Sequence, residues 1–167
     1  MRSKFQIILI LSLCLFSCTY YNTFYNAKRS FKEAEKKQKS LARGAKSTAA
    51  NQKYEEAIKK ASKVLAFHPK SKWADDALFL IGRAYYNMEQ YAKAERKFKE
   101  LLASFPKSKF VMECHYYVSL CQYKSGNESD AIQSLKMIVQ SSKTEKKKRA
   151  EVAFMLGDIY FEREEYD

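Results

Sequence analysis

Apolar residues recur along the chain in a pattern that predicts a repeated pair of helices. Residues 54–73 align without a gap with residues 91–110, which lie 37 positions later. Within each copy, apolar residues return every three or four positions, as is typical of an amphipathic helix with one buried face. Pro69 and Pro106, the two prolines of the chain, fall at the same repeat position. Because proline stops a helix, each copy is predicted to end in a turn.

The helices that follow these prolines also repeat. Residues 77–86, 114–123 and 152–161 share one apolar and aromatic pattern at shifts of 37 and 75 residues, so the period is 37 to 38 residues. Small residues stand at equivalent positions, where we expect paired helices to approach closely: Gly82, Ser119 and Gly157 on the first helices, and Ala57, Ala94 and Ala131 on their partners. Stacked antiparallel pairs of this kind form a solenoid, because each pair buries its apolar face against its neighbours.

The spacing within the repeat is similar to that of the TPR motif, although a usual TPR is about 34 residues long. The matching positions are Leu78, Ile81, Gly82, Tyr85, Tyr91, Ala94, Phe98 and Pro106. The Phe-Pro-Lys-Ser segment at 105–108 and the segment at 77–86 look most like the periplasmic TPR lipoproteins related to BamD, a subunit of the outer-membrane β-barrel assembly machine. Residues 21–27 also resemble envelope TPR lipoproteins, and together these resemblances extend over nearly all of residues 18–167. They imply an all-α, TPR-like α-solenoid that binds proteins.

Composition supports the all-α prediction. Glycine occurs only 4 times and proline twice, so the turn residues that many strands need are missing. The 31 basic and 19 acidic residues give a net charge of +12. The basic excess concentrates in residues 28–46 and 143–149. Such clusters suit membrane headgroups or nucleic acid.

An export signal at the N-terminus favours the membrane as the partner of these clusters. Arg2 and Lys4 precede an apolar run over residues 5–16, which is too short to span a bilayer. The segment Leu15-Phe16-Ser17-Cys18 resembles the bacterial lipobox, with a mild departure at its second position. This resemblance implies a lipoprotein signal peptide over residues 1–17 and lipidation of Cys18. An uncleaved anchor helix is the alternative.

The lipobox resemblance also implies a location. Thr19, rather than aspartate, follows the cysteine, which in proteobacterial lipoproteins permits transport to the outer membrane. We therefore expect a lipid-anchored protein of the outer membrane that faces the periplasm. No nucleic-acid partner is expected there.

Residues 18–48 are expected to form a lipid-anchored juxtamembrane segment with a basic amphipathic helix. Aromatic rings at 20, 21, 24 and 25 suit the membrane interface. Basic residues recur at helical spacing on one face and are assigned to the membrane surface: Lys28, Lys32, Lys36, Lys39, Arg43 and Lys46. A solvated face on a helix packed against the repeats is the alternative. Gly44 and the polar stretch 47–51 are expected to end or kink the helix.

The TPR register indicates which residues line the concave face of the array. Two aromatic residues recur there in each unit, and basic residues occur at two positions; the candidate partner-binding groove is Phe79, Arg83, Tyr86, Tyr116, Tyr123, Lys124, Phe154 and Phe161. Rigid aromatic rings supply contact area for a bound peptide at low entropic cost. Packing between adjacent repeats is the alternative role for these rings.

No pattern of catalytic residues occurs in the sequence. It holds only two histidines and lacks a glycine-rich phosphate loop, so we expect no enzyme activity, no cofactor and no small-molecule substrate. Cys114 and Cys121 are seven residues apart, about 10 Å along a helix, which is beyond disulfide reach. We expect them to pack as small buried residues and not to hold a metal.

The predicted function is a membrane-anchored scaffold for proteins of an envelope assembly complex, foremost in β-barrel assembly. A TPR adaptor of a Tol-associated, pilus or polysaccharide-export system is an alternative, as is the non-catalytic part of a longer envelope enzyme. Residues 49–167 are assigned to the repeats. Tyr166 occupies the repeat position of Tyr54 and Tyr91, so a truncated final pair is expected.

Overall fold

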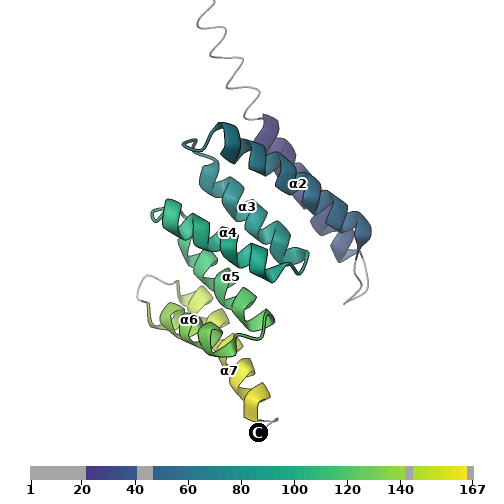
Figure 1. Ribbon diagram of the computed structural model, residues 1–167. Coiled ribbons are helices and arrows are strands. Elements are labelled where there is room, and N and C mark those ends of the chain that lie inside the picture. The colour runs from purple at the N-terminus through teal and green to yellow at the C-terminus, as the bar shows by residue number, and fades with distance from the viewer. Residues whose placement is uncertain (1–21, 41–46, 142–144, 165–167) are drawn as a thin grey trace, which may run out of the picture. The chain divides into compact units, whose positions relative to one another are not determined.

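The computed structural model describes residues 22–40, 47–141 and 145–164, and the side chains of that last stretch as far as residue 161. All regular secondary structure in these ranges is helical (Figure 1). The chain divides into two compact units, residues 1–84 and 85–167. Cys18, Tyr20, Tyr21, Arg43 and Lys46 lie outside the described residues.

The helices follow one another with short connections. An N-terminal helix spans residues 22–39. It is followed by α2 (Thr48–Phe67), α3 (Ala74–Asn87), α4 (Tyr91–Ser104), α5 (Val111–Lys124), α6 (Glu128–Gln140) and α7 (Lys146–Glu164). The predicted all-α fold of consecutive helix pairs is confirmed.

The start of α2 differs from the expectation that residues 47–51 end the preceding helix. Ser47 is instead the N-cap of α2, and its hydroxyl accepts a hydrogen bond of 3.0 Å from the backbone N–H of Ala50. A serine side chain at this position satisfies an N–H group that has no partner within the helix. The polar stretch therefore begins a helix.

The two prolines act as expected. Helix α2 ends at Phe67 and α4 at Ser104, two residues before each proline. The connections before α4 and α6 are also equivalent, because a left-handed residue occurs in both: Glu89 at φ 60° and Gly126 at φ 83°. A side chain opposes this backbone conformation, whereas glycine accepts it freely.

Buried residues repeat along all these helices. On the N-terminal helix and on α3, α5 and α7, positions spaced by four and then three are buried: Ala27, Phe31, Ala34; Ala77, Ile81, Ala84; Cys114, Val118, Cys121; and Val152, Leu156, Ile159. The same spacing is buried on α2, α4 and α6: Ala57, Ala61, Val64; Ala94, Phe98, Leu101; and Ala131, Leu135, Ile138. The N-terminal helix thus carries the same burial spacing as the repeat helices, which agrees with the alternative in which it packs against the repeats.

Aromatic contacts hold the first unit together. The ring of Phe31 packs edge-on against Tyr54 of α2, with centroids 5.4 Å apart, and Phe24 lies 5.4 Å from Trp73. The Tyr54 hydroxyl donates a 2.7 Å hydrogen bond to the Gln38 side chain. Tyr54 is fully buried, so the N-terminal helix is part of the core of this unit.

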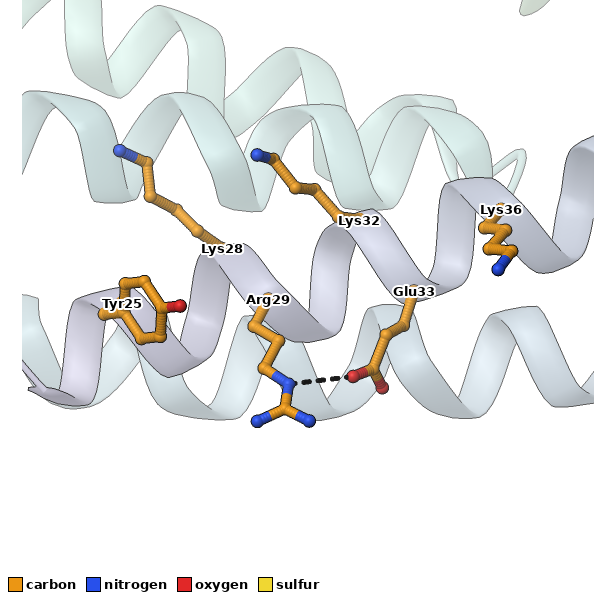
Figure 2. Close-up of a pocket in the computed structure, with 6 residues that line it drawn as sticks. All are labelled: Tyr25, Lys28, Arg29, Lys32, Glu33 and Lys36. Atoms are coloured by element: carbon orange, nitrogen blue, oxygen red, sulfur yellow. Dashed lines mark hydrogen bonds and ion pairs between the residues drawn. The ribbon is translucent and has the colours of Figure 1, made fainter.

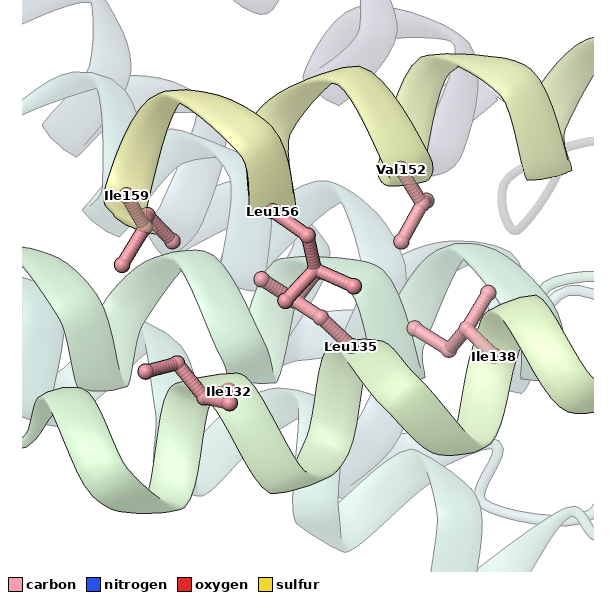
Figure 3. Packing of buried hydrophobic residues seen from close by; sticks show 6 residues of the cluster. All are labelled: Ile132, Leu135, Ile138, Val152, Leu156 and Ile159. Carbon is pink, nitrogen blue, oxygen red and sulfur yellow. The ribbon is translucent and has the colours of Figure 1, made fainter. Parts of the chain in front are cut away.

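In the second unit, α4 packs on α5, α5 on α6 and α6 on α7. Figure 3 shows the α6–α7 contact, in which branched aliphatic side chains of the two helices face one another: Ile132, Leu135 and Ile138 against Val152, Leu156 and Ile159. Phe98 of α4 is fully buried and stacks on Tyr117 of α5 at 4.9 Å.

Two of the small residues expected at close helix contacts differ in their exposure. Ser119 is buried as expected at a close helix contact, but Gly157 is exposed, and a Cβ added there would meet nothing within 4 Å. Its position on the outer side of α7 is not covered by any described helix. The helix expected to approach Gly157 would begin near Tyr166, outside the described residues, so this expectation stays a prediction.

Two phenylalanines of the second unit provide a matched test of this packing. Phe98→Ala removes a buried ring and is expected to lower the free energy of unfolding by about 3–5 kcal/mol. Phe154→Ala removes a ring that is 73% exposed and should change it by less than about 0.5 kcal/mol. Chemical denaturation followed by circular dichroism measures both. Equal losses would contradict the assignment of Phe98 to the core.

Candidate interaction surfaces

The exposed face of the N-terminal helix is basic. Figure 2 shows six side chains that line a shallow hollow along this helix: Tyr25, Lys28, Arg29, Lys32, Glu33 and Lys36. Lys39 is exposed as well. Four of the six predicted membrane-surface residues are therefore described and exposed, namely Lys28, Lys32, Lys36 and Lys39.

Burial of the opposite face determines where these cations lie. Phe24, Ala27, Phe31 and Ala34 are at most 5% exposed. At about 100° per residue, Ala27 and Ala34 lie across the helix from the basic side chains, and Phe24 and Phe31 flank them on the side of Lys28. Phe24 was expected at the membrane interface, but its contact with Trp73 places it in the core. Of the two aromatic residues described there, Tyr25 is the exposed one, at 55%.

Both acids of the N-terminal helix are paired with cations. Glu33 accepts a 3.1 Å bond from Arg29 and lies 3.2 Å from the Lys53 ammonium. These hydrogen bonds, that of Lys53 first, lower the pKa of Glu33. Glu35 lies 2.7 Å from the Arg83 guanidinium. Neither carboxylate pairs with Lys32 or Lys36, which form no ion pair within the described part of the chain.

A polar network joins α2 to the N-terminal helix. Glu56 pairs with Lys53 at 2.8 Å and with Lys60 at 2.6 Å. Lys60 also donates to the Ser30 hydroxyl at 3.0 Å, and Lys53 reaches Glu33. Hydrogen bonds from Lys53 and Lys60 lower the pKa of Glu56 to about 2. These ion pairs and hydrogen bonds therefore connect the polar side of α2 to the N-terminal helix.

The predicted groove residues of the first unit, Phe79 and Arg83, lie on α3. Phe79 is partly buried. Arg83 bonds to Glu35, and its guanidinium carbon lies 4.9 Å from the centre of the Phe31 ring. Arg83 therefore joins α3 to the N-terminal helix, a contact across 48 residues of sequence that spacing alone does not reveal.

Three groove aromatics of the second unit are packed. The ring of Tyr86 lies 5.6 Å from Tyr91 and 5.2 Å from Tyr117, and burial raises the pKa of Tyr86. Tyr116 lies beneath the Lys148 ammonium at 3.9 Å, and burial raises its pKa to about 12. Tyr123 packs against the α6–α7 cluster. These contacts favour a packing role for the three tyrosines.

The remaining groove residues are exposed. Phe154 and Phe161 of α7 are 73% and 65% exposed, and Lys124 at the end of α5 is exposed too. Phe154 and Phe161 are seven residues apart and so lie on one side of the helix. The predicted groove thus separates into packed tyrosines and an exposed pair of phenylalanines on α7.

The cysteines of α5 are buried side chains. Cys114 and Cys121 are free thiols with no exposed area. Burial raises the pKa of each thiol to about 12, so neither is a ready nucleophile or metal ligand at neutral pH. Within the described ranges, no three potential metal-ligating side chains come together. No described helix is both long and apolar enough to cross a membrane.

Comparison with known families identifies the group to which these features belong. Residues 34–141, from the second half of the N-terminal helix to the end of α6, match YfiO, a family of outer membrane lipoproteins. The protein belongs to this family. No curated protein matches the chain significantly. The predicted resemblance is confirmed at the level of the family, whose members are outer membrane lipoproteins.

The Glu56 network predicts a pH dependence. The pKa of Glu56 is about 2 in the folded protein and has its ordinary value of 4.5 when unfolded, so the unfolded chain binds a proton more readily. Its stabilising contribution is complete above about pH 4.5 and is lost as the pH falls towards 2. Glu56→Gln should therefore make the decline of unfolding free energy between about pH 5 and pH 2 shallower than in the wild type.

The control for this measurement is Glu55→Gln, because Glu55 is exposed and makes no ion pair within the described residues. It should leave the pH profile unchanged. If the pH profile of Glu56→Gln coincides with that of the wild type, the hydrogen bonds from Lys53 and Lys60 do not lower the pKa of Glu56.

Proposed function

We propose that the protein is a lipid-anchored scaffold that faces the periplasm and binds proteins during outer-membrane β-barrel assembly. The match of residues 34–141 to the outer membrane lipoprotein family carries this proposal. The packed helix pairs add to it, because arrays of this kind present extended surfaces to other proteins. Lipidation of Cys18 supplies the attachment in this proposal.

The exposed pair Phe154 and Phe161 is the part of the predicted groove that we propose for partner contact. Large aromatic side chains bury much area on binding and are enriched among residues that dominate interface energies. The packed tyrosines 86, 116 and 123 then support the helices and do not contact the partner. Lys124 adds a cation to the exposed set.

The double variant Phe154→Ala and Phe161→Ala tests this assignment. The variant should fold as the wild type does, since both rings are exposed. When the lipidated variant is purified after crosslinking in cells, less outer-membrane β-barrel protein should be recovered with it. Met137→Ala, which removes a 58% exposed side chain of α6, is the matched control and should recover the wild-type amount. Quantitative mass spectrometry of the crosslinked fraction measures the difference.

Two results would count against the proposal. Undiminished recovery by the double variant would exclude these rings from the contact. Recovery of Tol, pilus or polysaccharide-export components by the wild type, without any β-barrel protein, would exclude the assembly role itself.

Attachment is tested separately. Metabolic labelling with a fatty-acid analogue should mark the wild type and leave Cys18→Ala unmarked, because the proposed acceptor is the Cys18 sulfur. Cys14→Ala should be labelled as strongly as the wild type, since Leu13 before Cys14 is not a small residue. Equal labelling of the wild type and Cys18→Ala would refute this acceptor.

A further inference from the structure

We propose that the exposed face of the N-terminal helix is a docking surface for anionic lipid headgroups, which lays this helix along the membrane. The inference adds an electrostatic contact to the lipid anchor and does not require that Cys18 be lipidated. The surface is defined by Tyr25, Lys28, Arg29, Lys32 and Lys36, and we call it the basic stripe.

The basic stripe is a single face of one helix. At about 100° per residue, Lys28, Arg29, Lys32 and Lys36 all lie within about 60° of the direction of Tyr25. Residues 25–36 extend over roughly 16 Å of helix at 1.5 Å per residue. A row of cations on one side of a straight rod matches a flat anionic surface better than it matches a single small anion.

The fold keeps this face outward. The fully buried Ala27 and Ala34 lie on the opposite side of the helix, and Phe31, which flanks them, is held against Tyr54. Lys28 lies at the edge of the basic stripe. Its ammonium is positioned by two aromatic rings, 5.1 Å from the centre of the Phe24 ring and 5.5 Å from that of Trp73. The orientation of the basic stripe relative to this helix pair is therefore set by packing.

Acids of the described residues cancel only part of the charge of the stripe. Glu33, the one acid that lines the hollow, is shared by Arg29 and Lys53. Glu35 is bound to Arg83. Lys32 and Lys36 thus remain without an acidic partner among the described residues. Exposed cations of this kind are attracted by anionic lipid, and the attraction weakens with ionic strength.

The position in the chain favours lipid as the occupant. Cys18 precedes the start of the helix at residue 22 by four residues, which reach at most about 14 Å when extended. A chain held at Cys18 would therefore keep the helix within reach of the headgroups. Tyr25 is an exposed aromatic residue on the same face, and such rings favour the membrane interface.

Vesicle binding tests the proposal on a chain that begins at Thr19 and so retains all the described helices. Vesicles of phosphatidylcholine with phosphatidylglycerol should bind this chain at low ionic strength and release it as salt rises, whereas pure phosphatidylcholine vesicles should not bind it. Lys32→Gln with Lys36→Gln should weaken the binding roughly ten- to thirtyfold, because two cations near the surface are lost.

A matched control is present on the next helix. Lys59 and Lys63 of α2 are also exposed, four residues apart and without an ion pair within the described chain. Lys59→Gln with Lys63→Gln therefore changes the net charge equally and should retain most of the binding. Thermal melts of both double variants should match the wild type, since all four lysines are exposed.

Three outcomes would overturn the proposal. Wild-type binding by the Lys32 and Lys36 variant would exclude the stripe. Equal weakening by the two pairs would assign the attraction to the overall charge of the protein. Displacement from the vesicles by millimolar inorganic phosphate at constant ionic strength would indicate a site for a small anion in place of a membrane surface. Because Cys18 is absent from this chain, none of these outcomes depends on lipidation or on partner binding.

Discussion

The contact between Phe31 and Tyr54 is the interaction on which the first unit depends most directly. Neither the N-terminal helix nor α2 can bury its apolar face alone, and these two rings fill the space between them. The Tyr54 hydroxyl is satisfied by Gln38 at the same contact. Once this face is buried, the remaining face of the N-terminal helix must be the one that carries the cations. The packing of the core thus determines that the exposed face of the N-terminal helix is basic.

Repetition made most of the fold predictable. The spacing of alanines, large apolar residues and prolines indicated the helix pairs, their period and their ends, because burial demands the same pattern in each copy. The N-terminal helix was predicted as an amphipathic helix, but its packing against the repeats was only one of two alternatives, because it shares with α3 no more than the spacing and the two alanines of Ala27, Phe31 and Ala34. The family match confirms the group of proteins, while Cys18 and the partner-binding residues remain predictions.

The aromatic residues show why sites were harder to predict than the fold. Tyr86 and Phe161 occupy equivalent repeat positions, yet Tyr86 packs between Tyr91 and Tyr117 while Phe161 is exposed. Sequence spacing specifies the side of a helix on which a ring lies, but its burial depends on whether another helix covers that side. Likewise, the repeat register placed Arg83 in the groove. In the structure Arg83 bonds to Glu35, which lies 48 residues earlier, and no sequence spacing indicates this contact.

The burial of Cys114 and Cys121 has a consequence for how the chain matures. Their pKa of about 12 leaves roughly one thiol in 10⁵ ionised at neutral pH, and thiolates are the species that undergo disulfide exchange. In the unfolded chain, where α4 and α6 do not cover α5, both thiols would be accessible to oxidants. Packing of these three helices therefore removes both thiols from disulfide exchange. For this protein, helix packing is also a form of chemical protection.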